Sequence, residues 1–410
     1  MKVVNESNFG MAFKFFILFY AFSFWFMVPF ISIFIQYYGY YRESNVKDLL
    51  ETFYYTFPFF LVVFLNYFFG SIFINAIGLK KYKILSQAVN TNYKAKLFSY
   101  FLYFLSFVSI VILFFTRGLT LGEVGYGDQL ELNAGNGIYL IFLYLYLPAT
   151  LILILINEKI NFKKMIQFFL VGLVFGYVVF QFTGGSRNVF LGGICSIVLL
   201  FYYKKAVSLS QIFLFFTILI FLAAFFAIAR YSAYLDGEDL VYYTFLFTID
   251  SFSPIDTLSR IIKYYNGNNN QIGFDLFFTQ FEMFIPRFIW HDKPVLMYTN
   301  AMHITQYILG ESGRVIFSPS LVGTSIAMLG TKLYIFIACL TGWILLCVDK
   351  FIQSQSVVMK SIGFALLPLI FFLVRENFEY FVYRLLVTSV SVIVVYFLYK
   401  IFLSLLIVKR

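Results

Sequence analysis

The arginines are the residues of this sequence whose chemistry is most distinctive, because a guanidinium group binds phosphate or carboxylate through two parallel hydrogen bonds. When the hydrophobic segments are threaded as alternating membrane spans, eight of the ten arginines fall on one side and sixteen of the twenty lysines on the other. The eight are Arg42, Arg117, Arg187, Arg230, Arg260, Arg287, Arg314 and Arg375. The positive-inside rule explains the lysines but not the arginines. We therefore expect some of the arginines to bind an anion.

The turn Gly184-Gly185-Ser186-Arg187 is one candidate anion site. Glycine lets the backbone approach a ligand closely. A helix expected to begin near Asn188 would present free N–H groups and the positive end of its dipole beside Arg187. The alternative is a tight turn whose arginine reaches lipid headgroup phosphate.

The segment IPRFIWHDKP, residues 285–294, is the densest cluster of functional side chains. Its prolines restrict the backbone, and Arg287 and Lys293 are six residues apart. If the segment bends, both cations can face one polyanion. Asp292 can instead neutralise either of them.

The other candidate cations lie at the expected ends of spans or in a large loop. The complete expected anion-binding set is Arg117, Arg187, Arg230, Arg287, Lys293, Arg314 and Arg375, with headgroup binding as the alternative for those at span ends. Arg384 differs, because it lies inside the last expected span, where a charge suggests function. It can also pair with Glu376 or Glu379.

A proton acceptor would have to come from the scarce carboxylates and histidines of the same side. The candidates are Asp256, Glu282, His303 and Glu311. For each, an ordinary loop residue or ion-pair partner is the simpler interpretation. The sequence contains no Asp-x-Asp or His-x-x-x-His pattern, so we expect no metal or other cofactor.

The composition places these residues in an integral membrane protein. The 410 residues are 61% hydrophobic and only 12% charged, with a mean hydropathy of +0.85. Soluble domains carry about 25% charged residues. The net charge of +10 comes mostly from lysines at short inner loops, which argues against a nucleic-acid-binding surface.

Hydropathy predicts an all-α polytopic fold with about ten transmembrane helices and both termini in the cytoplasm. The expected spans cover residues 15–37, 53–78, 97–116, 137–156, 166–182, 188–203, 209–229, 331–348, 361–374 and 380–405. Residues 1–410 then form a single membrane domain.

One outer loop, residues 230–330 between the seventh and eighth spans, is far longer than the others, which is typical of a functional loop. Residues 240–252, 255–265 and 274–284 predict short interfacial helices. Ser318-Pro319-Ser320 predicts a further helix start, with Ser318 as N-cap and Pro319 at the first helical position. That helix should pause at Gly330.

The Pro-Arg-x-x-Trp motif of Pro286 to Trp290, followed by Lys293-Pro294 late in a large outer loop, resembles the O-antigen polymerase (Wzy) family. Gly273-Phe274, Gly330 and Arg375-Glu376 fit the same pattern. The chain departs from the pattern in two places. His291 stands where a proline is common, and a glutamate often seen near Gly323-Thr324 is absent.

The resemblance implies a metal-independent, C-type membrane glycosyltransferase at the periplasmic face of the bacterial inner membrane. Such an enzyme moves a glycan from undecaprenyl diphosphate onto a new lipid-linked repeat unit, with a separate co-polymerase setting chain length. Arginines that stabilise the departing diphosphate suit this chemistry, and we expect catalytic roles for Arg187, Arg287, Glu282, Asp256 and His303. The alternatives are an O-antigen ligase, which shares the donor, and a flippase or transporter, which would usually show internal repeats.

Overall fold

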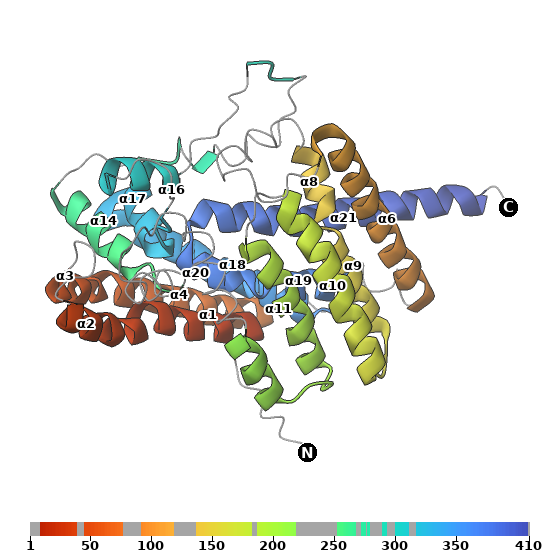
Figure 1. The fold of residues 1–410 in the computed structure, drawn as a ribbon, viewed down its shortest axis with the longest axis horizontal. Coiled ribbons are helices and arrows are strands. Elements are labelled where there is room, and N and C mark those ends of the chain that lie inside the picture. Colours follow the sequence, from red (N-terminus) through yellow and green to blue (C-terminus); the bar gives the residue numbers. More distant parts are fainter. Residues whose placement is uncertain are drawn as a thin grey trace.

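The computed structural model describes residues 9–38, 45–76, 92–118, 137–182, 187–218, 252–267, 272–275, 277–278, 289–292, 300–310 and 317–408. Every regular element in these ranges is a helix. Figure 1 shows the helices gathered into one bundle, with α1, α2 and α4 along one edge and α6, α9 and α10 at the other end. The predicted all-α fold is confirmed.

Within the described residues, eight helical segments are long and apolar enough to cross a membrane, which confirms a polytopic membrane protein. They are Met11–Tyr37, Val46–Ile74, Tyr93–Thr116, Gly137–Ile156, Phe162–Phe182, Ile335–Gln353, Val357–Arg375 and Phe378–Phe402. Each corresponds to one of the predicted spans. The predicted sixth span is the shorter helix α11, Arg187–Tyr203. The predicted seventh begins as an apolar helix at Leu209–Ile218, and its remainder lies outside the described residues.

The N-terminal span contains a π-helical turn. Helix α1, Met11–Ala21, continues through η1, Phe22–Phe26, into α2, Met27–Tyr38. A π-turn shifts the hydrogen-bond ladder by one residue. At this turn, Ser23 Oγ donates to the carbonyl oxygen of Phe252 at 2.8 Å, and Ser253 Oγ donates to the carbonyl oxygen of Ser23. The turn therefore attaches residues 252 and 253 of the predicted outer loop to the first span.

Helix α4, Phe53–Ala76, packs against α18, Ile335–Gln353, through a backbone approach at Gly342. A Cβ atom there would lie 2.9 Å from both the carbonyl oxygen of Val63 and Asn66 Cβ. Small residues permit such approaches between membrane helices. Glycine is thus required for this helix pair to pack as it does.

The N-terminus of α1 is capped from the far end of the sequence by Asp349 in α18. Its Oδ1 accepts the N–H of Ala12 at 2.7 Å, and its Oδ2 accepts the N–H of Phe13 at 3.3 Å and the hydroxyl of Tyr67 at 2.8 Å. Tyr67 Oη in turn accepts the N–H of Gly10 at 2.9 Å. A carboxylate at this place satisfies free N–H groups and favours the helix dipole.

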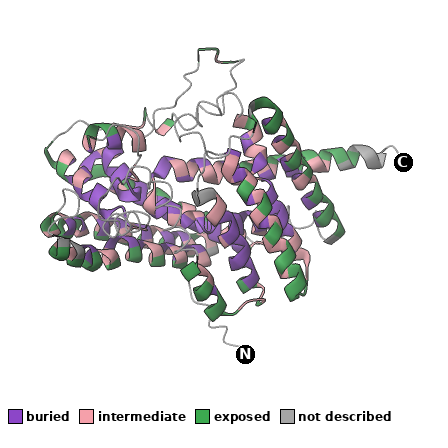
Figure 2. Cartoon of the chain, viewed as in Figure 1, coloured by how far each residue is buried: buried purple, intermediate pink, exposed green. Residues whose placement is uncertain are grey.

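The centre of the bundle is formed by α19, Val357–Leu366, and α20, Leu369–Arg375, which together make the predicted ninth span. Most of their residues are buried, as Figure 2 shows for the middle of the molecule. The helices that pack against them include α1; α18; α11; α9, Tyr146–Ile156; and α21, Phe378–Val408. Farther out, α6, Asn92–Arg117, packs against α9 and against α8, Gly137–Leu143, and α10, Phe162–Phe182, packs against α9 and α11. The outside of the bundle exposes many large apolar side chains, as expected for a lipid-facing surface.

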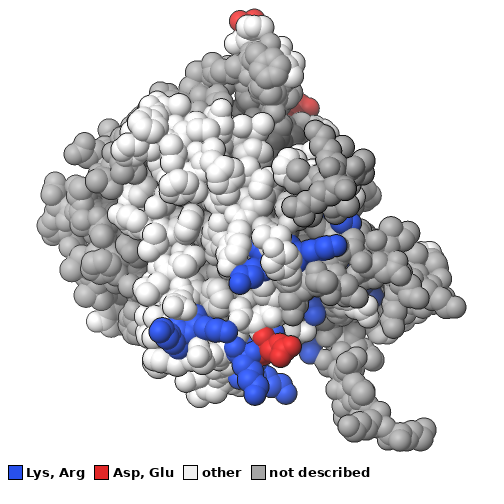
Figure 3. All heavy atoms as spheres, turned by 90° about the vertical axis from the view of Figure 1, so that its right-hand side faces the viewer, with Lys and Arg blue, Asp and Glu red and all other residues white. Residues whose placement is uncertain are grey.

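Lysines gather where α9, α10 and α11 meet the start of α19. Lys204 Nζ donates to the carbonyl oxygen of Leu155 at 3.0 Å, and Lys360 Nζ lies 5.6 Å from the centre of the Tyr203 ring. Burial and the charge of Lys360 lower the pKa of Lys204, against the opposing effect of Glu158. Figure 3 shows basic side chains gathered beside an acidic one at the lower end of the surface in view.

The predicted outer loop contributes α14, Ile255–Gly267; α16, Asn300–His303; η4, Ile304–Ile308; and most of α17, Leu321–Leu333. The prediction that Ser318 caps α17 is wrong. The N-cap is Ser320, whose Oγ accepts the N–H of Gly323 at 3.0 Å, so that the buried Leu321 begins the helix. The predicted pause is confirmed, because Gly330 has φ 74° and ψ 173° inside α17.

Candidate functional site

The structure describes only part of the predicted site. Arg230, Glu282, Arg287, Lys293, Glu311 and Arg314 lie outside the described residues. Arg117 and Arg187 are described by their helix positions. Asp256, His303 and Arg375 are described with their side chains.

Arg117 and Arg187 belong to the same end of the bundle. Arg117 is the last residue of α6, one turn after Leu113. Leu113 and Phe182, the last residue of α10, belong to one buried cluster. The chain from Phe182 to Arg187 spans at most about 18 Å. The ends of α6 and α10 are thus joined through this buried cluster at one end of the bundle.

Arg187 and Arg375 lie at the same side of the bundle as well. Arg187 begins α11, close to the predicted helix start, and Arg375 ends α20. A Cβ atom at Gly192 would lie 3.4 Å from Phe372 Cε2, which fixes the two helices at that level. From there, Arg187 is about 7.5 Å and Arg375 about 4.5 Å farther along, both toward the same side. Three span ends therefore place positions 117, 187 and 375 at one end of the bundle, called here the arginine face.

Helix geometry adds positive potential to the arginine face. The N-terminus of α11 points its free N–H groups toward this face, where they favour an anion. At the C-terminus of α20, Arg375 Nη1 lies 3.6 Å from Glu376 Oε1. That separation is longer than a charge-assisted hydrogen bond of about 2.8 Å. The ion pair between these two side chains is therefore a loose one.

The junction between α20 and α21 contains a polar cluster that the sequence analysis did not single out as a site. Glu379 is fully buried and accepts the side-chain N–H of Asn377 at 2.5 Å. The backbone N–H of Phe378 donates to Thr324 Oγ1 of α17 at 3.3 Å. The signal that could have revealed it is a short polar stretch between two spans, with three charged residues and an amide around one aromatic residue: Arg375-Glu376-Asn377-Phe378-Glu379.

Arg384 is held by tyrosines, and among the described residues it does not pair with Glu376 or Glu379 as the sequence analysis allowed. Its Nη2 donates to Tyr380 Oη at 2.7 Å. Its guanidinium carbon lies 4.7 Å from the Tyr144 ring centre, 4.9 Å from that of Tyr380 and 5.9 Å from that of Tyr383. Aromatic faces stabilise a cation within about 6 Å. This cage joins α21 to the α8–α9 connection beneath the arginine face.

The two described proton-acceptor candidates have different environments. Asp256 is 2% exposed in the first turn of α14, where a carboxylate stabilises the helix N-terminus. His303 is half-buried at the end of α16 and stacks on Tyr307, with ring centres 4.8 Å apart. Burial lowers the pKa of His303. The imidazole is therefore neutral near pH 7 and able to accept a proton.

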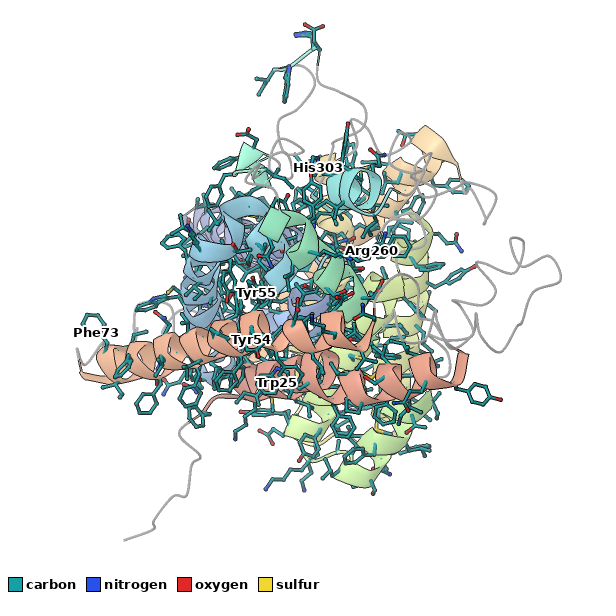
Figure 4. The ribbon with its side chains drawn as sticks, turned by 90° about the vertical axis from the view of Figure 1, so that its left-hand side faces the viewer. Trp25, Tyr54, Tyr55, Phe73, Arg260 and His303 are labelled. Atoms are coloured by element: carbon teal, nitrogen blue, oxygen red, sulfur yellow. The ribbon has the colours of Figure 1, made fainter. Side chains whose placement is uncertain are left out.

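Helices α14 and η4 are joined beside His303. Arg260 Nη2 donates to the carbonyl oxygen of Leu309 at 3.1 Å, and both helices belong to one packed group with α17. Figure 4 shows Arg260 and His303 on the side of the molecule away from Trp25. Thr305 Oγ1 accepts the N–H of Phe317 at 3.0 Å. These bonds connect the described pieces of the predicted loop to one another.

The described residues contain no group of three or more histidine, cysteine, aspartate or glutamate side chains that could hold a metal ion. The expectation of a metal-independent reaction stays a prediction.

Comparison with known protein families supplies an identification to set beside this geometry. A family model described as "WzyE protein, O-antigen assembly polymerase" matches residues 3–410. No solved structure matches the chain.

Proposed function

The chain belongs to the WzyE family of O-antigen assembly polymerases, and we propose that it joins undecaprenyl-diphosphate-linked repeat units at the periplasmic face of the inner membrane. Family membership makes the protein a membrane glycosyltransferase that polymerises polysaccharide from lipid-linked repeat units. Family membership therefore favours a polymerase over the O-antigen ligase and the flippase or transporter that the sequence left open. The lipid carrier, the membrane face and the residues of the site are the proposal.

The reaction that we propose is a substitution at the anomeric carbon of the growing glycan. A hydroxyl of the incoming lipid-linked unit attacks that carbon and forms the new glycosidic C–O bond. The bond from the same carbon to the diphosphate oxygen breaks, and undecaprenyl diphosphate leaves with the electron pair. The hydroxyl proton passes to a protein base. Negative charge therefore develops on the diphosphate as the transition state forms.

The arginine face is the proposed binding site of this diphosphate. The observation that carries the proposal is the convergence of three span ends that present Arg117, Arg187 and Arg375 beside the N-terminus of α11. Fixed cations and N–H dipoles aimed at developing charge lower a barrier without reorganisation. Arg230, Arg287, Lys293 and Arg314 complete the proposed set from the sequence.

His303 is the base that we favour over Asp256 and Glu282. It is partly exposed and neutral near pH 7, because burial lowers its pKa. Asp256 is 2% exposed and sits at a helix N-terminus, a setting that serves stability. Glu282 and Glu311 remain candidates from the sequence.

The surroundings of the reaction follow from the same proposal. Residues 1–410 form one membrane domain in the inner membrane, with both termini cytoplasmic and the 230–330 loop periplasmic. A separate co-polymerase sets the chain length. The lysine-rich end of the bundle supports this orientation through the positive-inside rule.

The test is elongation by the purified protein in lipid vesicles supplied with a lipid-linked repeat unit. Wild type should give a ladder of longer glycans on the lipid. Arg187→Gln and Arg287→Gln should each slow elongation about 10²–10³-fold, the usual loss for one transition-state donor. Arg42→Gln is the matched control, because Arg42 lies among the acids Glu43, Asp48 and Glu51. Wild-type rates in both site variants would refute the arginine face as the diphosphate site.

A further inference from the structure

An open groove of about 490 Å³ lies between α6, α9 and α10. Its walls include Tyr100, Tyr103, Phe107, Leu153, Gln167 and Phe175. The wall is mostly aromatic and aliphatic. The Tyr103 hydroxyl is hydrogen-bonded to Thr150 Oγ1 at 2.6 Å, and the other polar groups of the wall are the Tyr100 hydroxyl and the Gln167 amide. Such a wall suits a flexible apolar chain.

Two lysines lie at one end of this groove. Lys96 Nζ is 5.8 Å from the centre of the Tyr100 ring. Lys164 Nζ donates to Asn157 Oδ1 at 2.8 Å, and Asn157 Nδ2 donates to the carbonyl oxygen of the wall residue Leu153 at 2.7 Å. Both lysine side chains are exposed. The apolar groove thus has a positively charged end.

The dimensions of the groove match one leaflet of a bilayer. Along α10, the wall runs from Gln167 to Phe175, about 12 Å of helix. Half of a hydrocarbon core is about 15 Å. Along α6, Lys96 and Arg117 are separated by about 31 Å, a full hydrocarbon thickness. The charged end of the groove and the arginine face therefore belong to opposite membrane surfaces.

We propose that this groove binds one anionic phospholipid of the leaflet on the lysine side. One acyl chain lies against the aromatic wall, and the headgroup phosphate lies between Lys96 and Lys164. This site is separate from the proposed diphosphate site, and only the exclusion of the lipid-linked substrate as its occupant rests on the proposed function.

Charge and depth select this occupant over two others. The lipid-linked substrate would place its diphosphate at the arginine face, about 31 Å from these lysines. A second copy of the chain would have the same orientation in the membrane, so its own lysine-rich end would meet this one at the same depth and repel it. An anionic headgroup instead complements both ammonium groups, each of which contributes to binding near a membrane surface.

The experiment is native mass spectrometry of the full chain in detergent, titrated with phosphatidylglycerol or with phosphatidylcholine of the same acyl chains. Wild type should bind phosphatidylglycerol more tightly. The double variant Lys96→Gln/Lys164→Gln should lose about fivefold per lysine, or about 25-fold in all, for phosphatidylglycerol, with little change for phosphatidylcholine. Val171→Phe, which fills the groove wall, should weaken both lipids.

Matched controls lie beside each changed residue. Lys94→Gln removes an exposed charge two residues from Lys96, and Val174→Phe enlarges a residue of α10 that is 61% exposed outside the groove. Neither should alter lipid binding. The double variant Lys96→Arg/Lys164→Arg keeps both positive charges and should keep the preference for phosphatidylglycerol. If the glutamine variant fails to fold, this variant and Val171→Phe together test whether the lysine charges and the groove bind the lipid.

Four results would overturn the proposal. They are equal affinity of wild type for the two lipids, unchanged binding by Val171→Phe, an equal loss in Lys94→Gln, and displacement of the lipid by inorganic phosphate alone. A dimer that Val171→Phe dissociates would show that a second copy covers the groove.

Discussion

The carboxylate of Asp349 provides the sharpest test of how this bundle holds its first helix. Replacing Asp349 with alanine removes the acceptor of the Ala12 and Phe13 N–H groups and of the Tyr67 hydroxyl. Replacing Gly10 with alanine should displace the same carboxylate by a steric clash, because a Cβ atom there would lie only 2.1 Å from Asp349 Cγ. The two changes should therefore disable one interaction.

The expected magnitude follows from the number of groups left without a partner. Loss of a helix N-cap costs about 0.5–2 kcal/mol, and a hydrogen bond to a charged group contributes about 1.5–3 kcal/mol. Part of this is offset, because Asp349 is 1% exposed and removing a buried carboxylate relieves its desolvation. We expect Asp349→Ala to lower the free energy of unfolding by about 3 kcal/mol and Asp349→Asn, which keeps one acceptor oxygen, by about half as much.

The assay is thermal unfolding in detergent, followed by circular dichroism, with hydrogen exchange of the peptide covering residues 9–21. Gly10→Ala should cost about 2 kcal/mol in the wild-type background and less than about 0.5 kcal/mol in the Asp349→Ala background, the non-additivity expected of residues in direct contact. Gln353→Ala, an exposed change on the same helix, serves as control. Equal costs of Gly10→Ala in both backgrounds would refute the capping account.

Three further changes test the site and the packing. Burial lowers the pKa of His303, so the elongation rate should fall as pH drops through that lowered pKa, below the ordinary value of about 6.5. His303→Gln should be at least about 10²-fold slower and lack this acidic decline, and a variant with the wild-type pH profile would exclude His303 as the base. Arg384→Lys keeps the charge but loses the planar stacking on the tyrosine rings. It should lower the free energy of unfolding by about 1–2 kcal/mol in thermal unfolding. Tyr383→Phe keeps the aromatic ring beside Arg384 and should leave the free energy of unfolding unchanged. Gly342→Ala should cost about 1–3 kcal/mol in the same assay, because its new Cβ meets backbone of α4 at 2.9 Å; Gly192→Ala meets a ring at 3.4 Å and should cost little, so equal losses would contradict this reasoning.

Hydropathy predicted the spans well, because each crossing must satisfy its own backbone hydrogen bonds and cover them with apolar side chains. Both properties are local. Helix α14, Ile255–Gly267, and the break at Gly330 were predictable for the same reason. The N-cap of α17 was not, because Ser318 and Ser320 both satisfy the local rule. Burial of Leu321 against the rest of the bundle selects the second serine.

Contacts between distant residues escaped prediction. Asp349 lies 337 residues from Ala12, and nothing near either residue in the sequence indicates their bond. Arg384 was recognised as an unusual charge, but its partners were sought among nearby carboxylates. One of its partners, Tyr144, lies on a different span. The chain contains 32 tyrosines, so residue type alone could not identify it.

The tyrosine cage of Arg384 has an electrical consequence. Tyrosine rings and hydroxyls stabilise a guanidinium but do not cancel its charge, so a net positive charge remains at the seventh residue of the 25-residue span Phe378–Phe402. A charge that crosses the whole membrane exchanges about 2.3 kcal/mol per 100 mV with the membrane potential. About a quarter of the field, or about 0.6 kcal/mol per 100 mV, would act on Arg384. The voltage of an energised membrane thus contributes to the free energy of holding Arg384 at its depth in the span.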